Sequence, residues 1–231
     1  EHQLTLNTLV QGAWALLLSR YSGENDVVFG ATRACRHSSL AAIESMVGIF
    51  INTLPVRVQI NDATELLPWL KALRAQWVAV RDYEHTPLVK VQAWSDVPQG
   101  RGLFDSLLIF DNLEFDAAIK GEGSQWQDRE FELIEQIPYP LILKAAGGSH
   151  LNLTIQFVGA ASTLENRHQF TEIAVIQMLS DLETLLQNFV SDPQSRVCEL
   201  ETDRVKSYHQ DLANRTYFGP SNRPPASSLL S

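Results

Sequence analysis

Three segments of the chain repeat apolar residues with the spacing of an amphipathic helix. The first spans residues 6–21, with Thr5 placed to cap its N-terminus. The second begins at Thr64, and the third begins near Thr171 and ends at Asp192-Pro193, where proline stops a helix. The apolar positions are Leu6, Leu9, Val10, Ala13, Trp14, Leu17 and Tyr21; then Leu66, Trp69, Leu70, Leu73, Trp77 and Val80; then Val175, Ile176, Leu179, Leu182, Leu186 and Phe189. This spacing predicts three helices.

Four shorter segments have the patterns of β-strands. Residues 26–31 form a continuous run rich in β-branched and aromatic side chains, and residues 104–110 form another apolar run. Apolar and polar residues alternate over residues 54–60 and 151–157, which is typical of a strand with one face in water. Pro55 places that end of its strand at a sheet edge or at the entry of the strand, because proline has no N–H to donate.

The order of these elements predicts the fold class. Helices and strands are interleaved, but several neighbouring strands have no helix between them, which favours a mixed sheet over a parallel one. Residues 32–39 are polar and basic and are predicted to form a loop, and Gly147-Gly148 is predicted to be a turn between two strands. Residues 201–231 have the composition of a linker or tail. We therefore expect one α/β domain over residues 1–200.

The amino-acid composition argues against some classes of binding partner and indicates the cellular compartment. The 231 residues are 45% hydrophobic, which excludes general disorder, and the net charge of −9 argues against nucleic acid or an anionic membrane as partner. The longest apolar stretch, residues 13–18, is too short to span a bilayer, and the first residues lack a secretory-signal pattern. Cys35 and Cys198 are isolated, so we expect a reducing, cytoplasmic setting without structural disulfides.

Motifs of self-contained catalysis are missing from the sequence. No two of the six histidines have metal-ligand spacing, and HExxH, CxxC, GxGxxG and GxSxG do not occur, so no metal site is expected. Cys35 stands near Arg33 and Arg36, which would favour a thiolate, but a small loop residue is the simpler interpretation. Glu84-His85 suits either an acid/base pair or a polar cap where the helix ends. No catalytic residue is assigned to this chain.

Five segments, taken in order, nevertheless resemble one known family. They are VFGAT (28–32) followed by Arg36, MVGIFINTLPVR (46–57), YEHTPL (83–88), LFDSLLIFDN (103–112) and YPL (139–141). Together they resemble the C-terminal half of the condensation domain of nonribosomal peptide synthetases, over roughly residues 4–200. The segment Arg33-Ala34-Cys35 departs from the family pattern.

The resemblance implies a fold, a reaction and partners. The fold would be a two-layer chloramphenicol-acetyltransferase-like subdomain, a mixed sheet with helices packed on one face. A whole domain of this kind joins acyl or peptidyl and aminoacyl thioesters in an amide bond. Donor and acceptor carrier proteins deliver them on phosphopantetheine arms, so no permanently bound cofactor is expected. The family's HHxxxDG signature lies in the N-terminal half, which makes that half a required partner alongside neighbouring synthetase domains.

The same resemblance suggests roles for particular residues. Residues 111–136, long for a loop, would cross toward the N-terminal half. Gly48, Asn52 and Thr53 would border the substrate channel, with Asn52 either bonding a thioester or pantetheine amide or capping a turn. Arg36 would either contact a carrier or its phosphopantetheine phosphate or be a solvated surface residue.

Other functions of the same fold stay open at this point. An epimerisation domain shares it, although its counterpart of the strand at 104–110 usually reads differently, and an ester-forming relative is a further alternative. A non-catalytic platform that recruits carrier proteins or tailoring enzymes belongs to another class. An intact HHxxxDG upstream would favour catalysis, and its loss would favour the platform.

Overall fold

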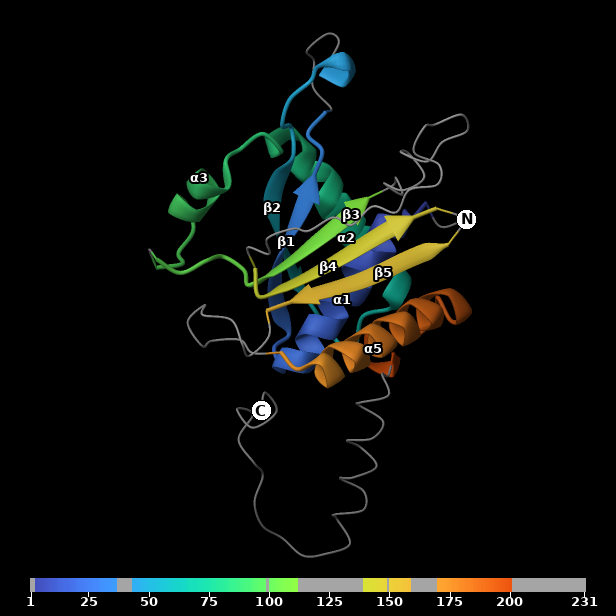
Figure 1. Ribbon diagram of the computed structural model, residues 1–231. Helices are drawn as coiled ribbons and strands as arrows, with labels where there is room; N and C mark the ends of the chain where they lie inside the picture. Colours follow the sequence, from blue (N-terminus) through green and yellow to red (C-terminus); the bar gives the residue numbers. More distant parts are fainter. Residues whose placement is uncertain are drawn as a thin grey trace, which may run out of the picture. The chain divides into compact units, whose positions relative to one another are not determined.

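The computed structural model (Figure 1) describes residues 3–36, 43–98, 100–111, 139–148, 150–158 and 170–200. The expected crossover segment, apart from Asp111, and the expected tail at 201–231 lie outside these residues. The described chain divides into two compact units. The first consists of Glu1–Val27, Arg57–Ala75 and Ile176–Ser231, and the second of Val28–Val56 and Gln76–Val175.

Five strands form a mixed sheet in the order β2-β1-β3-β4-β5. Their bounds are β1 Asp26–Arg33, β2 Asn52–Gln59, β3 Ser106–Asp111, β4 Leu141–Gly147 and β5 Leu151–Phe157. β1 pairs with β3 and β3 with β4 in parallel, whereas β4 and β5 are antiparallel. The predicted α/β class and mixed sheet are confirmed, and among the described strands β2 lies at an edge, one of the two positions that Pro55 allows.

Helices α1 (Leu6–Ser22) and α5 (Glu172–Ser191) and the first part of α2 (Leu66–Ala79) carry the core of the first unit. Thr5 caps α1 by accepting a hydrogen bond from the Thr8 N–H, and Gly23, at φ 77°, ends it. Gly12 marks the close approach of the helices, because a Cβ there would lie 3.1 Å from the Trp69 ring and 3.5 Å from that of Phe189.

A buried polar contact also joins α1 to α5 within the first unit. The Tyr21 hydroxyl and Asp181 Oδ2 are 2.8 Å apart, and Gln177 Nε2 donates to Asp181 Oδ1 at 3.1 Å. Asp181 is buried, and these bonds satisfy the polar oxygens that burial removes from water. The contact therefore fixes the register of α5 against α1 where apolar packing alone would allow sliding.

The second unit contains β3, β4 and β5 and the connections that follow β1 and α2. A 3₁₀ helix, η1 (Ile43–Ser45), precedes β2, while η2 (Val80–Tyr83) and α3 (Leu88–Ala93) follow α2. Leu108 of β3 and Leu143 of β4 are opposite each other in the register and both are buried. The turn predicted at Gly147-Gly148 joins β4 to β5.

Several sequence-based boundaries are wrong in detail. β1 continues through Thr32 and Arg33, which were expected in a loop, and α2 begins at Leu66 rather than Thr64. α3 was not predicted, because six residues are too few for a periodic signal. Ile176, expected on the apolar stripe of α5, is 60% exposed, and Met178 and Leu185 are buried on that helix.

Candidate functional site

A buried ion pair lies beneath the expected site residues, all of them in the second unit. Arg33 Nε, at the end of β1, is 2.7 Å from Glu84 Oε2, and the Glu84 side chain is 0% exposed. Arg33 Nη1 also donates to the Trp77 carbonyl at 2.8 Å, and the guanidinium lies 4.5 Å from the centre of the Trp77 ring. Arg33 therefore places a positive charge beside a carboxylate that is removed from water.

The backbone carbonyl of Glu84 accepts contacts from two of the side chains near the expected site. Asn52 Nδ2 donates to the carbonyls of Glu84 and Thr86, both at 2.8 Å, and Asn52 Oδ1 accepts from the Thr53 N–H at 2.9 Å. The Cys35 Sγ lies 3.3 Å from the same Glu84 oxygen. The first residue of β2 is thus tied to the turn between η2 and α3, and the amide of Asn52 is occupied by backbone groups.

Cys35 has the environment of a structural thiol. It is buried, its φ of 49° is unusual for a residue with a side chain, and burial raises the pKa of its thiol. The charge of Glu84 raises that pKa further, while the Asn52 N–H and the Arg33 charge act in the opposite direction. The raised pKa opposes thiolate formation, and Cys35 lies in the irregular segment that follows β1.

Glu84 and His85 do not form an acid/base pair in this structure. Glu84 Oε1 is 4.0 Å from His85 Nε2, but the carboxylate is buried against Arg33 while the His85 side chain is 54% exposed. The two neighbours therefore face different environments. The arrangement favours the polar-cap interpretation of the sequence, with Glu84 as an internal ion-pair partner.

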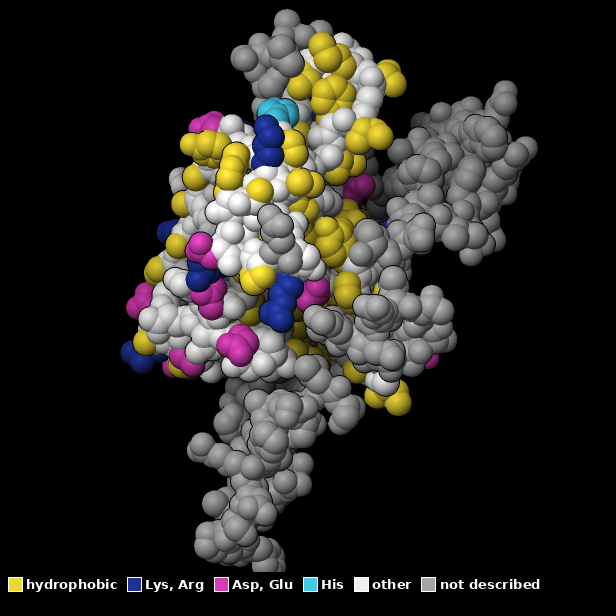
Figure 2. Space-filling model, turned by 90° about the vertical axis from the view of Figure 1, so that its left-hand side faces the viewer, with side chains coloured by type: hydrophobic (Ala, Val, Ile, Leu, Met, Phe, Trp, Pro, Cys, Tyr) yellow, Lys and Arg dark blue, Asp and Glu magenta, His cyan; other side chains and the backbone are white. Residues whose placement is uncertain are grey.

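The segment Met46–Ile51, called here the apolar loop, projects above this buried network. Val47 is 103% exposed, Ile49 97% and Ile51 67%, and none of the six residues carries a charge. This loop lies next to η1, at the top of the view in Figure 1, and Figure 2 shows hydrophobic side chains gathered there. An exposed apolar cluster of this kind is typical of an interaction surface.

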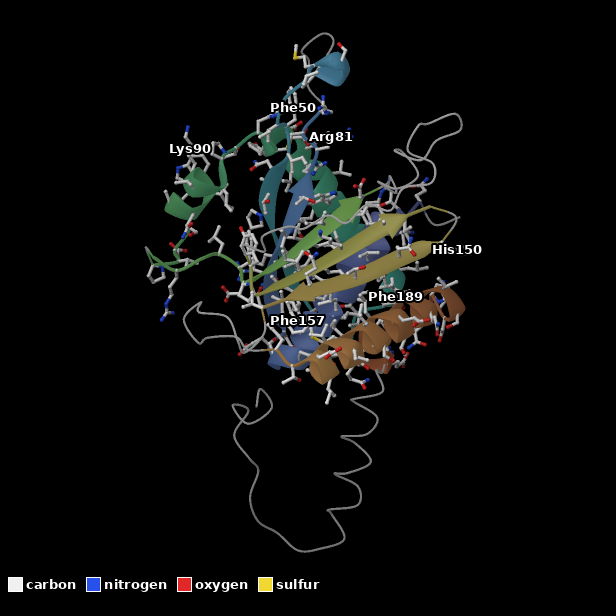
Figure 3. All side chains as sticks on the ribbon, viewed as in Figure 1. Phe50, Arg81, Lys90, His150, Phe157 and Phe189 are labelled. Carbon is white, nitrogen blue, oxygen red and sulfur yellow. The ribbon has the colours of Figure 1, made fainter. Side chains whose placement is uncertain are left out.

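Arg36 contacts both η1 and the apolar loop through its guanidinium. Its Nη1 donates to the carbonyls of Ile43 and Met46, each at 3.0 Å. Its guanidinium also lies 4.4 Å from the centre of the Phe50 ring, the residue labelled at the base of the loop in Figure 3. The side chain for which a carrier or phosphate contact and a solvated position were both open thus donates to the chain's own backbone.

The structure gathers the expected site residues but not into a catalytic constellation. Asn52 and Thr53 begin β2, Gly48 lies in the apolar loop, and Arg36 lies under it. Sequence reasoning missed the pairing of Arg33 with Glu84, because no local pattern links residues so far apart in the chain. Within the described ranges no group of three metal-ligating side chains occurs, and no helix there is long and apolar enough to cross a membrane. The described residues form an internally bonded polar network and, next to η1, an exposed apolar loop.

The chain is similar in sequence to one protein family and to several known synthetases. The family model described as Condensation domain matches residues 1–210. The chain is 43% identical over 201 residues to one of the linear gramicidin synthase proteins of Brevibacillus parabrevis, covering 87% of this chain and 4% of that protein. It is 27% identical over 208 residues to surfactin synthase subunit 3 of Bacillus subtilis (strain 168), covering 88% and 16%. The chain thus spans a small part of these relatives.

Solved structures share the fold at low sequence identity. A four-domain nonribosomal peptide synthetase, holo-AB3403 bound to AMP and glycine, matches with a TM-score of 0.71 and 17% identity over 88% of this chain and 16% of that one. A mutant of the starter condensation domain of the rhizomide synthetase RzmA matches with 0.65 and 17%, over 85% and 44%. The X-domain in its complex with OxyB from teicoplanin biosynthesis matches with 0.67 and 20%, over 85% and 42%.

Proposed function

Because the chain belongs to the condensation-domain family, we propose that it is the C-terminal half of a peptide-synthetase condensation domain. The whole domain would form an amide bond between an acyl or peptidyl thioester on a donor carrier protein and the amine of an aminoacyl thioester on an acceptor carrier. The family match over residues 1–210 carries this proposal, together with 43% identity to a linear gramicidin synthase protein.

The division of labour between the halves follows from what this chain contains. The sequence has no His-His pair, and the described site holds a buried ion pair and a thiol whose pKa is raised by burial, neither of which suits the role of a general base. This half would contribute a wall of the channel, and the other half would supply the HHxxxDG histidine. The rate advantage that this half supplies would come from holding two tethered thioesters close together. It would not come from a catalytic side chain of this chain.

Residues Gly48, Asn52 and Thr53 are proposed to border the substrate channel. For Asn52, the three hydrogen bonds to backbone groups support a contribution through the position of β2. Phosphopantetheine arms of the carrier proteins would enter past this wall, and neighbouring synthetase domains would deliver them. No bound cofactor takes part in the proposal.

A recruitment platform is the second candidate. One neighbour of the same fold is an X-domain solved in complex with OxyB, at 20% identity and a TM-score of 0.67. A chain with this fold can therefore be built around protein recruitment, and a domain without the histidine motif would fit that use. Epimerising and ester-forming relatives are the remaining variants of the catalytic proposal.

The two candidates are separated by a reaction with the intact domain. Donor and acceptor carrier proteins are loaded, mixed with the domain that contains this chain, and the acceptor-bound product is identified by mass spectrometry. We expect a dipeptidyl amide from the intact domain and none from this chain alone. The matched control replaces the second histidine of the upstream motif by alanine.

Each result has a defined meaning. Turnover by the isolated chain at the rate of the intact domain would refute the division between halves. Absence of amide product from the intact domain, with both carriers loaded and still bound by it, would refute condensation and favour the platform. An ester or an epimerised thioester as the product would assign the corresponding relative.

A further inference from the structure

The apolar loop combines exposure with a fixed backbone. Val47 and Ile49 are almost entirely in water, although valine and isoleucine are among the residue types most often buried. At the same time, Arg36 makes two hydrogen bonds and one ring contact that hold the loop at Ile43, Met46 and Phe50. A loop ordered in this way presents its apolar side chains without a further entropic cost on binding.

We infer that Arg36 is a positioning residue that clamps the apolar loop, and that Val47 and Ile49 on this loop form a contact with the N-terminal half of the same domain. The inference rests on the proposed function, which supplies that half. It assigns to Arg36 a role different from that of a phosphate contact.

The length of a whole condensation domain and the absence of charge on the apolar loop together indicate which surface binds this loop. This chain covers only 44% of a solved condensation domain of the same fold, so more than half of such a domain lies beyond it. The segment 46–51 has no charged residue, and the nearby Arg36 donates to two carbonyls through Nη1 while its guanidinium lies over the Phe50 ring. A phosphorylated arm or an acidic carrier surface is recognised by cationic side chains, which residues 46–51 do not carry, whereas a second apolar surface needs none.

The test compares thiol accessibility in two forms of the protein. Val47→Cys and Ile49→Cys are each made in this chain and in the intact domain, with the exposed Cys198 replaced by serine in both forms. Labelling by a maleimide is followed by mass spectrometry. The matched control is Val89→Cys on α3, because Val89 is 78% exposed and lies in the same unit.

We expect the labelling rates at positions 47 and 49 to be at least tenfold lower in the intact domain than in this chain. The rate at position 89 should agree between the two forms within twofold. Equal rates at 47 and 49 in both forms overturn the contact. Protection that appears only after a loaded carrier protein is added also overturns it, and assigns the loop to the carrier.

Arg36→Lys and Arg36→Met, made in the intact Val47→Cys protein, test the clamp. Lysine keeps the charge but lacks the planar guanidinium, which lies over the Phe50 ring while its Nη1 bonds two carbonyls. Both substitutions should therefore raise labelling at position 47 by several fold. Protection retained in Arg36→Lys and lost in Arg36→Met would overturn the clamp and show that charge alone matters.

The measurement is independent of turnover, so the two proposals fail separately. A protected loop in a domain that forms no amide leaves the contact intact and removes the condensation function. An accessible loop in an active domain does the reverse. Where the isolated variant chains unfold, the comparison of positions 47 and 49 with position 89 inside the intact domain decides the question.

Discussion

Two arginines of this chain make ion pairs of opposite kinds. Arg57 contacts Asp26 through three donor–acceptor distances of 2.6 to 3.2 Å, but the two side chains are 66% and 39% exposed. The hydrogen bonds from Arg57 lower the pKa of Asp26, so the pair persists at neutral pH. Arg33 makes one short contact with Glu84, whose side chain is fully buried. The contribution of each pair to the free energy of unfolding should depend more on its burial than on the number of its contacts.

Arg33→Met should destabilise the fold far more than Arg57→Met. The first substitution leaves the carboxylate of Glu84 buried without a counter-charge, which costs about 3–5 kcal/mol of unfolding free energy. The second removes a pair that water and salt already screen, so its effect should be small. Urea denaturation monitored by circular dichroism measures both. Equal losses of unfolding free energy from the two substitutions would show that burial of Glu84 does not make its pair with Arg33 the stronger one.

Asn52→Ala should lower stability more than it slows the reaction. The substitution removes both bonds from Asn52 Nδ2 to the part-buried carbonyls of Glu84 and Thr86, and a loss of about 1–3 kcal/mol is expected. The Thr86 carbonyl loses its partner, whereas the Glu84 carbonyl keeps the contact with Cys35. The matched control is Asn61→Ala, which removes one exposed bond to the Ala63 N–H. Urea titration gives the stabilities, and single-turnover rates of the intact domain give the chemistry. A slowed rate at unchanged stability would instead establish direct substrate contact.

At the scale of elements, hydrophobic periodicity predicted the strands and helices whose residue pattern repeats. It missed short extensions and contacts between distant segments, which leave no repeating pattern. The alternation over residues 54–60 predicted β2, and the spacing from Leu6 predicted α1 with its Thr5 cap. The end of β1 was missed because Thr32 and Arg33 are polar, yet they extend the strand. The ion pair at Glu84 and the clamp by Arg36 depend on the path of the backbone between distant segments, which no local pattern encodes.

Gly30→Ala should weaken the packing between β1 and the segment before β3. A Cβ at Gly30 would lie 2.7 Å from Phe104 Cζ, and that ring also packs on Tyr139 with 5.3 Å between centroids. Displacing the ring should cost about 1–3 kcal/mol of unfolding free energy.

Gly102→Ala is the control for this substitution. Its Cβ would come no closer than 3.5 Å to the Phe104 backbone, an ordinary contact distance. Thermal melts of both variants provide the comparison. Equal melting temperatures for the Gly30 variant and the wild type would mean that the Phe104 ring has room to move.

At the scale of the whole molecule, neither compact unit is continuous in sequence. The first unit takes its residues from three separate stretches and the second from two. Within the first unit, α5 contributes the fully buried Leu182 and Leu185 and the Asp181 carboxylate that bonds Tyr21. A core assembled from distant stretches requires all of them before any is stable.

A chain ending at residue 170 should therefore lack a cooperative thermal transition. It keeps most of the sequence but loses α5, so the buried faces of α1 and α2 in the first unit would be left in water. A chain ending at Leu200 is the control, because residues 201–231 are expected to be a linker or tail. Far-UV circular dichroism against temperature gives the result. A sharp transition in the shorter chain, or its loss in the longer one, would contradict this account.

The placement of Pro55 has a consequence for handling the chain in isolation. Among the described strands β2 and β5 are the two borders of the sheet, and a border strand offers unpaired N–H and C=O groups to any passing chain. β2 carries a proline and the exposed Arg57, both of which discourage another strand from adding there. β5 has neither proline nor charge along Leu151–Phe157. Aggregation of a concentrated preparation should therefore start along β5, and Thr154→Lys, at an exposed position of that strand, is the substitution to make first.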